Sequence, residues 1–174
     1  MLIIDDNLKS LMIQHLIVEN PEKNFDNNSI SLSLDNTIIR FIGNETNEII
    51  YGDDFPEELY IQEELKSSEY LILKPKEGVL ACSKEFVKMP LGYFGLLQTK
   101  GSLARLLVTI HCCDSQIDPG FEGKITFEII NLSNYTIKIL PGKFIGALYL
   151  IKTSSEGIAY NGKYNNSLIP TIQK

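Results

Sequence analysis

Short apolar segments with alternating or β-branched residues follow one another along most of the chain, and this succession constrains the fold most strongly. From residue 29 onward Gly, Pro, Asn and Asp separate the segments, most of which begin about 8–14 residues after the one before, a spacing typical of an all-β sandwich or barrel. We therefore predict a mainly β fold. The predicted strands span residues 29–34, 37–43, 69–75, 78–86, 92–99, 104–112, 123–131, 135–141 and 143–152.

Three segments depart from this pattern. Residues 5–18 carry apolar side chains at helical spacing, which predicts a short N-terminal helix that Asp5 or Asp6 could cap. Residues 44–68 are acidic and polar, and we expect a surface excursion there. Residues 153–174 are polar and contain glycines and a proline, which predicts a loop-like tail. Because no linker divides the 174 residues, we expect a single domain over 1–174.

Charge and cysteine content limit the class of function. The formal net charge of −6 argues against non-specific binding to nucleic acid or anionic membranes, which needs a basic face. The N-terminus lacks the pattern of a secretory signal, and no apolar run approaches the roughly 20 residues of a membrane span, so we expect a cytoplasmic protein. Cys82, Cys112 and Cys113 form no CxxC pair, which predicts neither disulfides nor a zinc site.

A single carboxylate, Glu128, interrupts the predicted strand at 123–131. Ile125, Phe127 and Ile129 share one face of that strand, whereas Glu128 shares the other face with Thr126 and Ile130. If the second face is wet, Glu128 is an ordinary surface acid. If the face is partly buried, its pKa rises, as a general acid or base requires. The sequence pattern leaves both interpretations open.

Two further stretches are candidates for ligand binding. In KGSLAR (100–105), two cations flank a glycine and a serine, an arrangement that can bind an anion or simply form a tight connection between elements. In IDPGFEG (117–123), Asp118, Pro119 and Gly120 are typical of a turn. That turn either joins two strands or directs Asp118 and Phe121 toward a base or sugar.

Taken together, these stretches resemble the dCTP deaminase branch of the dCTP deaminase/dUTPase superfamily. The similarity rests on KGSLARLLVTIHCCDSQIDPGFEGKITFEIIN, on LPGKFIGALYL and on the step from Arg105 to Glu128. The tail AYNGKYNNSLIPT resembles the C-terminal Lys-Tyr segment of the family, and the similarity covers almost the whole chain. It implies a distorted jelly-roll β-barrel of the dUTPase type, assembled as a homotrimer with active sites between subunits.

The resemblance also implies a reaction, namely zinc-independent deamination of dCTP to dUTP and ammonia. Glu128 would activate the water that attacks C4 of cytosine, and Arg105 of a neighbouring subunit would orient Glu128. The H-x-E…P-C-x-x-C signature of zinc deaminases is absent from the sequence. A dUTP pyrophosphatase or bifunctional enzyme, and a non-catalytic nucleotide-binding regulator, are the alternatives.

The remaining roles that the resemblance implies concern the nucleotide. Asp118 would bind the sugar hydroxyl, Phe121 would pack on the sugar, and the tail from 153 would close over a triphosphate accompanied by Mg²⁺. The resemblance also makes dTTP a candidate inhibitor. The implied nucleotide-binding positions are Lys100, Gly101, Ser102, Asp114, Gln116, Asp118, Phe121, Tyr160, Lys163 and Tyr164.

At four positions the sequence departs from the usual family pattern. Gly101 stands where the family has a serine, Asp114 where it has an alanine, Ser31 where it has an aspartate, and Lys100 where it has an arginine. Lysine keeps the charge of arginine but loses its bidentate geometry. These positions make a modified cytosine nucleotide a further candidate substrate.

Overall fold

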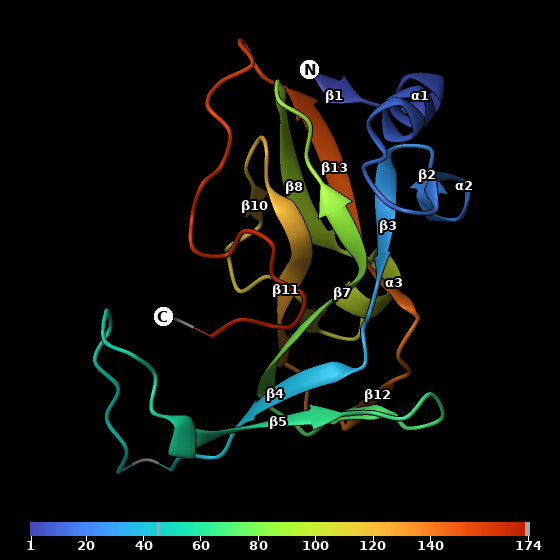
Figure 1. Cartoon of the computed structure of the whole chain (residues 1–174). Helices are drawn as coiled ribbons and strands as arrows, with labels where there is room; N and C mark the ends of the chain where they lie inside the picture. Colours follow the sequence, from blue (N-terminus) through green and yellow to red (C-terminus); the bar gives the residue numbers. More distant parts are fainter. Residues whose placement is uncertain (45, 173–174) are drawn as a thin grey trace.

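The computed structural model describes residues 1–44 and 46–172, and antiparallel strands dominate these ranges (Figure 1). One sheet has the strand order β10–β8–β13–β3–β2, and β1 also pairs with β13. Its strands are β1 (Leu2–Ile3), β2 (Phe25–Asp26), β3 (Ser29–Ser33), β8 (Tyr93–Thr99), β10 (Gln116–Ile117) and β13 (Phe144–Lys152).

A second sheet has the order β5–β4–β7–β11–β9, and β6 pairs with β12 as a separate ribbon. The members of the second sheet are β4 (Thr37–Phe41), β5 (Tyr60–Glu64), β7 (Gly78–Lys88), β9 (Val108–Thr109) and β11 (Glu122–Asn131). The ribbon consists of β6 (Leu71–Leu73) and β12 (Ile137–Ile139). The mainly β prediction is therefore confirmed.

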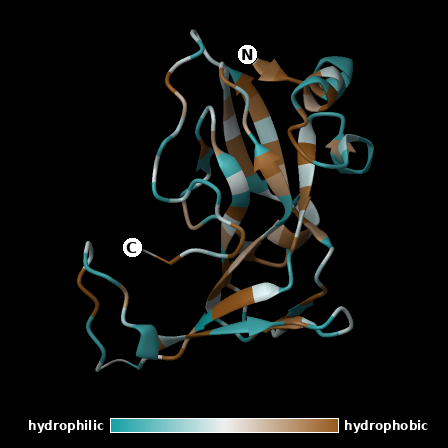
Figure 2. Cartoon of the chain, in the orientation of Figure 1, coloured by the Kyte–Doolittle hydropathy of each residue, from teal (hydrophilic) through white to brown (hydrophobic). Residues whose placement is uncertain are grey.

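Alternating residues build the core between the sheets. In β11, Phe127 and Ile129 are fully buried, and Leu148 and Leu150 of β13 are buried in the same cluster. Removing this much apolar surface from water is the main force that holds the sheets together. Figure 2 shows long hydrophobic stretches on β13 and alternating hydrophobic and hydrophilic residues on β11, whereas β5 is mostly hydrophilic. The opposite face of β11 is only partly buried and is therefore free to line a site.

In β3 both faces are buried, although its sequence alternates Ser with apolar residues. The backbone N–H and hydroxyl of Ser33 donate to the carboxylate of Glu85 at 2.8 and 2.7 Å. The side-chain amide of Asn24 donates to the same carboxylate at 3.0 Å. These bonds satisfy polar groups that would otherwise be costly to bury.

The N-terminal helix α1 spans Asp5–His15 and buries Leu8, Leu11 and Met12. The prediction of a helix is confirmed, but the predicted aspartate cap is wrong. Ile4 holds the N-cap position without a side-chain bond, and Asp5 and Asp6 lie inside the first turn. Their negative charges still interact favourably with the positive end of the helix dipole. Short turns of helix occur at α2 (Pro21–Asn24), η1 (Glu57–Leu59) and α3 (Gly101–Ala104).

One sequence prediction of local structure is wrong, and a second is incomplete. The segment 104–112 does not form one strand, because α3 ends there and only Val108–Thr109 pairs with β11. Leu107 has a φ of 59°, a left-handed conformation that breaks the extended backbone just before β9. The described residues of the predicted excursion 44–68 are mostly exposed, as expected, but the sequence pattern does not reveal β5 within it, which pairs with β4 along its whole length.

Candidate active site

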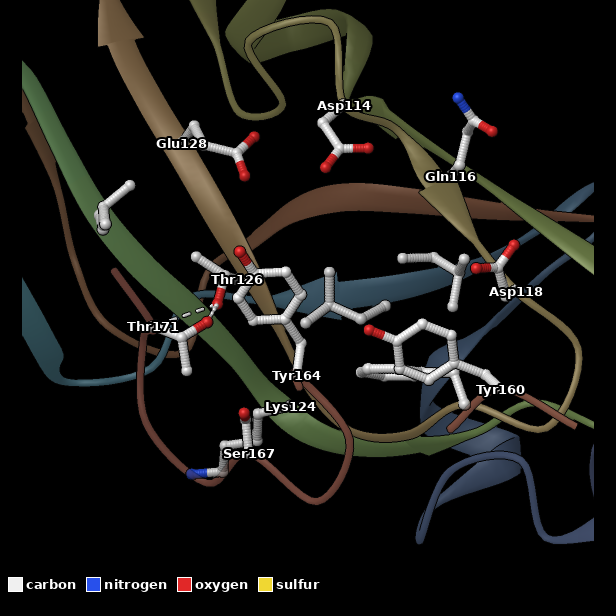
Figure 3. Close-up of a pocket in the computed structure, with 14 residues that line it drawn as sticks. Asp114, Gln116, Asp118, Lys124, Thr126, Glu128, Tyr160, Tyr164, Ser167 and Thr171 are labelled. Carbon is white, nitrogen blue, oxygen red and sulfur yellow. Dashed lines mark hydrogen bonds between the residues drawn. The ribbon is translucent and has the colours of Figure 1, made fainter. Parts of the chain in front are cut away.

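A cavity of about 500 Å³ lies on the partly buried face of β11 (Figure 3). The strand itself, the segment that leads into it and the C-terminal tail all contribute to the walls. A volume of this size suits a small organic ligand. The lining residues are Leu80, Asp114, Gln116, Ile117, Asp118, Phe121, Lys124, Ile125, Thr126, Glu128, Tyr160, Tyr164, Ser167 and Thr171.

Glu128 lies on β11 and points into this cavity (Figure 3). Burial, followed by the nearby charge of Asp114, raises the pKa of Glu128 from 4.5 to about 7. Its Oε2 atom is buried and has no hydrogen-bond partner within the described ranges. Glu128 is thus a carboxyl group that can exchange a proton near neutral pH, and the wet-face interpretation is wrong.

Asp114 reaches the same end of the cavity from the loop between β9 and β10. The carboxylates of Asp114 and Glu128 are drawn side by side in Figure 3. His111 holds the loop before Asp114: its carbonyl accepts the backbone N–H of Asp114 at 2.6 Å, and His111 forms a β-bridge with Glu128. Two carboxyl groups from different elements therefore share one end of the cavity.

The predicted turn at 117–123 forms the opposite end of the cavity. Phe121 is buried there, and its ring lies 5.9 Å from the ring of Tyr160 in a tilted arrangement. Gly120 has a φ of 79°, and a Cβ atom at this position would lie 2.8 Å from Ala159. A glycine is therefore required for the tail to approach, and Tyr160 N–H donates to the carbonyl of Pro119 at 2.9 Å. Asp118 lines the cavity beside this contact.

The C-terminal tail runs along β11 and closes one side of the cavity. Asn166 N–H donates to the carbonyl of Glu122 at 2.6 Å, and Lys124 N–H donates to the carbonyl of Ser167 at 2.8 Å. Farther along, the hydroxyls of Thr126 and Thr171 are 3.1 Å apart. The tail is loop-like, as predicted from the sequence, but backbone and side-chain bonds attach it to the strand that carries Glu128.

Lys124 provides a cation in the wall of the cavity, but its charge is already paired. Its ammonium group forms an ion pair with the buried carboxylate of Asp35. The thiol of Cys82 lies 3.7 Å from the same carboxylate. Burial, and then the charge of Asp35, raises the pKa of Cys82 to about 12, so this thiol stays protonated.

Several predicted site residues lie outside the lining of this cavity within the single chain. Lys100 pairs instead with Asp26 at 2.6 Å, while Ser102 and Arg105 are exposed. A Cβ atom at Gly101 would meet no atom within 4 Å, so a serine could be accommodated there. Lys163 lines a neighbouring cavity beyond the tail, with its ammonium 5.1 Å from the ring centre of Tyr164. The structure thus brings together seven predicted residues: Asp114, Gln116, Asp118, Phe121, Glu128, Tyr160 and Tyr164.

Sequence reasoning missed other residues of the cavity. Lys124 and Thr126 precede Glu128 on the same face of β11, so the two-residue period of a strand could have identified them. Ser167 and Thr171 lie in the tail, where no periodicity exists to locate them. The described residues contain no group of three or more His, Cys, Asp or Glu side chains that could hold a metal ion. None of the described helices is long and apolar enough to cross a membrane.

Comparisons with known proteins identify the family of the chain. A family model described as dCTP deaminase-like matches residues 3–153. A protein of Dictyoglomus thermophilum named dCTP deaminase, dUMP-forming, is 29% identical over 183 residues, covering 100% of this chain and 94% of its own. A protein of Rhodococcus opacus with the same name is 34% identical, covering 84% of this chain and 80% of its own.

A solved structure shows the same fold. The crystal structure of 2′-deoxycytidine 5′-triphosphate deaminase from Agrobacterium tumefaciens matches with a TM-score of 0.75 at 18% identity. The match covers 89% of this chain, which spans about half of that larger chain (49%). The predicted jelly-roll architecture of the dUTPase type is thereby confirmed. The sequence match and the shared fold together show that the chain belongs to the dCTP deaminase-like family.

Proposed function

We propose that this protein catalyses the hydrolytic deamination of dCTP, and that Glu128 is its general base and acid. The observation that carries the proposal is the position of Glu128 in the cavity with a pKa raised to about 7. A group with this pKa is present in both protonation states at neutral pH, as proton transfer in both directions requires. The relatives named as dCTP deaminases supply the substrate class.

In the proposed reaction, ionised Glu128 takes a proton from the water that attacks C4 of the cytosine ring. Protonated Glu128 then returns a proton to the departing amino group, which leaves as ammonia. The buried Oε2 atom has no partner in the described chain and is available for these transfers. Because the ionised form begins the reaction, kcat/KM is expected to rise as the pH increases through about 7.

The other end of the cavity suits the deoxyribose. The rings of Phe121 and Tyr160 provide an apolar surface for the sugar, and Asp118 is a carboxylate acceptor for its hydroxyl. We place the triphosphate beyond Tyr160, under the tail. Mg²⁺ would be held mainly by phosphate oxygens, which are the hard ligands that this ion prefers.

The names of the relatives, which are dUMP-forming, support a further step for the uracil nucleotide. We propose dUMP and pyrophosphate as the final products, with Asp118 positioning a second water near the phosphates. The product expected from the resemblance alone, dUTP, would then be an intermediate. Measuring ammonia and pyrophosphate in parallel separates the two outcomes, since pyrophosphate forms only if dUTP is cleaved.

The decisive experiment measures ammonia released from dCTP and Mg²⁺ by the wild type and by Glu128→Gln. The variant should lose at least about a hundredfold in kcat, because general acid–base catalysis commonly contributes that much. Glu122→Gln is the matched control, since Glu122 is an exposed residue on the same strand. No ammonia from any cytosine nucleotide would reject deamination. If dCTP stabilised the protein without turnover, a nucleotide-binding regulator would be favoured instead.

A further inference from the structure

The end of the cavity that holds Glu128 is acidic. Asp114 and Glu128 both direct carboxyl groups into it from different elements (Figure 3), and the charge of Asp114 contributes to the raised pKa of Glu128. The cation of the cavity, Lys124, does not offset this charge because it pairs with Asp35. Other titratable residues near this end are His111, whose backbone forms a bridge with Glu128, Cys112 and Cys113 of the same loop, and Tyr164 of the tail.

We propose that Asp114 selects the pyrimidine ring by its 4-substituent, favouring a 4-amino group and disfavouring a 4-oxo group. The inference rests on the proposed function, which places C4 of the base beside Glu128. It names Asp114 as a specificity-determining residue that weakens the binding of uracil and thymine nucleotides from solution, whereas the proposed dUTP intermediate forms inside the cavity and does not have to enter it.

The physical reason lies in the hydrogen-bonding pattern of the two ring types. A 4-amino group presents N–H donors, and a carboxylate can only accept while it is ionised. A 4-oxo group presents lone pairs, which face the oxygens of Asp114 without a donor between them. An acceptor–acceptor contact of this kind is the repulsive element on which discrimination often depends.

The selection does not require Glu128 to be ionised. Protonated Glu128 could donate to a 4-oxo oxygen, but the oxygens of Asp114 still face that ring.

One consequence concerns inhibition. A thymine nucleotide that competes for this cavity has to place its 4-oxo group beside Asp114. We therefore expect dTTP to be a weak competitor of dCTP in the wild type, and replacing Asp114 should strengthen it. Asp114→Asn should have a larger effect than Asp114→Ala, because the amide provides an N–H donor to the oxo oxygen.

The test compares the α,β-imido analogues of dCTP and dUTP, which share the same sugar and phosphates. Binding is measured by calorimetry with Mg²⁺ in a Glu128→Gln background, where turnover is prevented. Adding Asp114→Ala should lower the Kd of the uracil analogue, relative to the Kd of the cytosine analogue, about fivefold to tenfold. Asp114→Asn should lower this ratio still further. In the otherwise unchanged enzyme, dTTP inhibition of deamination should strengthen with the same two substitutions.

Controls separate this inference from the proposed function. Glu122→Ala removes an equal charge outside the cavity, and it should change both Kd values alike. An unchanged ratio in both Asp114 variants, with tight binding of both analogues, would overturn the selection by Asp114 and leave the proposed function standing. Failure of both analogues to bind the Glu128→Gln protein would overturn the proposed function, and the selection with it.

Discussion

At the scale of single residues, Glu128 has an energetic effect that is separate from any reaction. Its side chain is partly buried beside another carboxylate, and both features disfavour the charged form. The folded chain therefore binds a proton at Glu128 more tightly than the unfolded chain does. Linkage between protonation and folding then makes stability depend on pH.

The sign of that dependence can be checked directly. The pKa of Glu128 is about 7 in the folded chain and near its ordinary value of 4.5 when unfolded. Between these values the folded state holds more protons, so the contribution of Glu128 to stability falls as the pH rises from about 4.5 to 7. Above pH 7 Glu128 is ionised in the folded chain, and its contribution lowers the free energy of unfolding by the full amount.

We predict that Glu128→Gln is more stable than the wild type at pH 8 but not at pH 4.5. The expected gain at pH 8 is about 1 kcal/mol, reduced because the side chain is partly solvated. Denaturant unfolding at several pH values measures it, with Glu122→Gln as the exposed control on β11. A gain that is equal at both pH values would contradict the assigned pKa.

At the scale of elements, alternation was the reliable guide. It located β11 to within a residue of 123–131 and assigned Phe127 and Glu128 to opposite faces. It failed over 104–112, where the sequence stays apolar but the backbone does not stay extended, because Leu107 adopts a left-handed conformation. It also failed to find β5, because an exposed edge strand with glutamates resembles a loop in sequence.

The candidate site was predictable to the extent that it lies on that alternating strand and its preceding turn. Asp118, Phe121 and Glu128 belong to these elements and were identified from the sequence. The contacts of the tail were not, because Thr171 meets Thr126 across 45 positions and no local pattern encodes such a pairing. Long-range contacts of this kind depend on the complete fold.

We predict that the Thr126 hydroxyl holds the end of the tail. It lies 3.1 Å from the Thr171 hydroxyl and accepts the backbone N–H of Thr171 at 3.2 Å. Thr126→Val keeps the β-branched shape and removes both bonds, each worth about 1 kcal/mol. Amide hydrogen exchange across 165–172 should become about fivefold faster or more.

Thr37→Val on β4 is a suitable control, since it makes the same chemical change on a strand of the same sheet. Amide hydrogen exchange in the tail of the Thr37→Val variant should match that of the wild type. Equal exchange in the tail of Thr126→Val and the wild type would show that the other bonds to β11 suffice.

At the scale of the whole molecule, the two predicted catalytic residues, Glu128 and Arg105, do not meet within one chain. Glu128 lies in the cavity, whereas Arg105 is exposed outside it in the same chain, together with Ser102. Leu106 and Leu107, which follow Arg105, are 51% and 60% exposed. An arginine beside exposed leucines has the composition of a contact surface rather than of an ordinary solvated loop.

We therefore predict that Arg105 completes the site of a neighbouring subunit in a homotrimer. Glu128→Gln and Arg105→Ala should each be nearly inactive alone. If the two proteins are mixed and allowed to exchange subunits, about a quarter of the sites should combine an intact Glu128 from one chain with an intact Arg105 from another. Ammonia release from dCTP should recover to about that fraction of the wild-type rate. A mixture of Glu128→Gln with Glu128→Ala is the control, because no combination of these chains restores Glu128. If subunits exchange, as verified by mass spectrometry of the mixed assembly, but activity stays at the level of the single variants, Arg105 and Glu128 do not cooperate across subunits. Arg105 would then act elsewhere than in the proposed site.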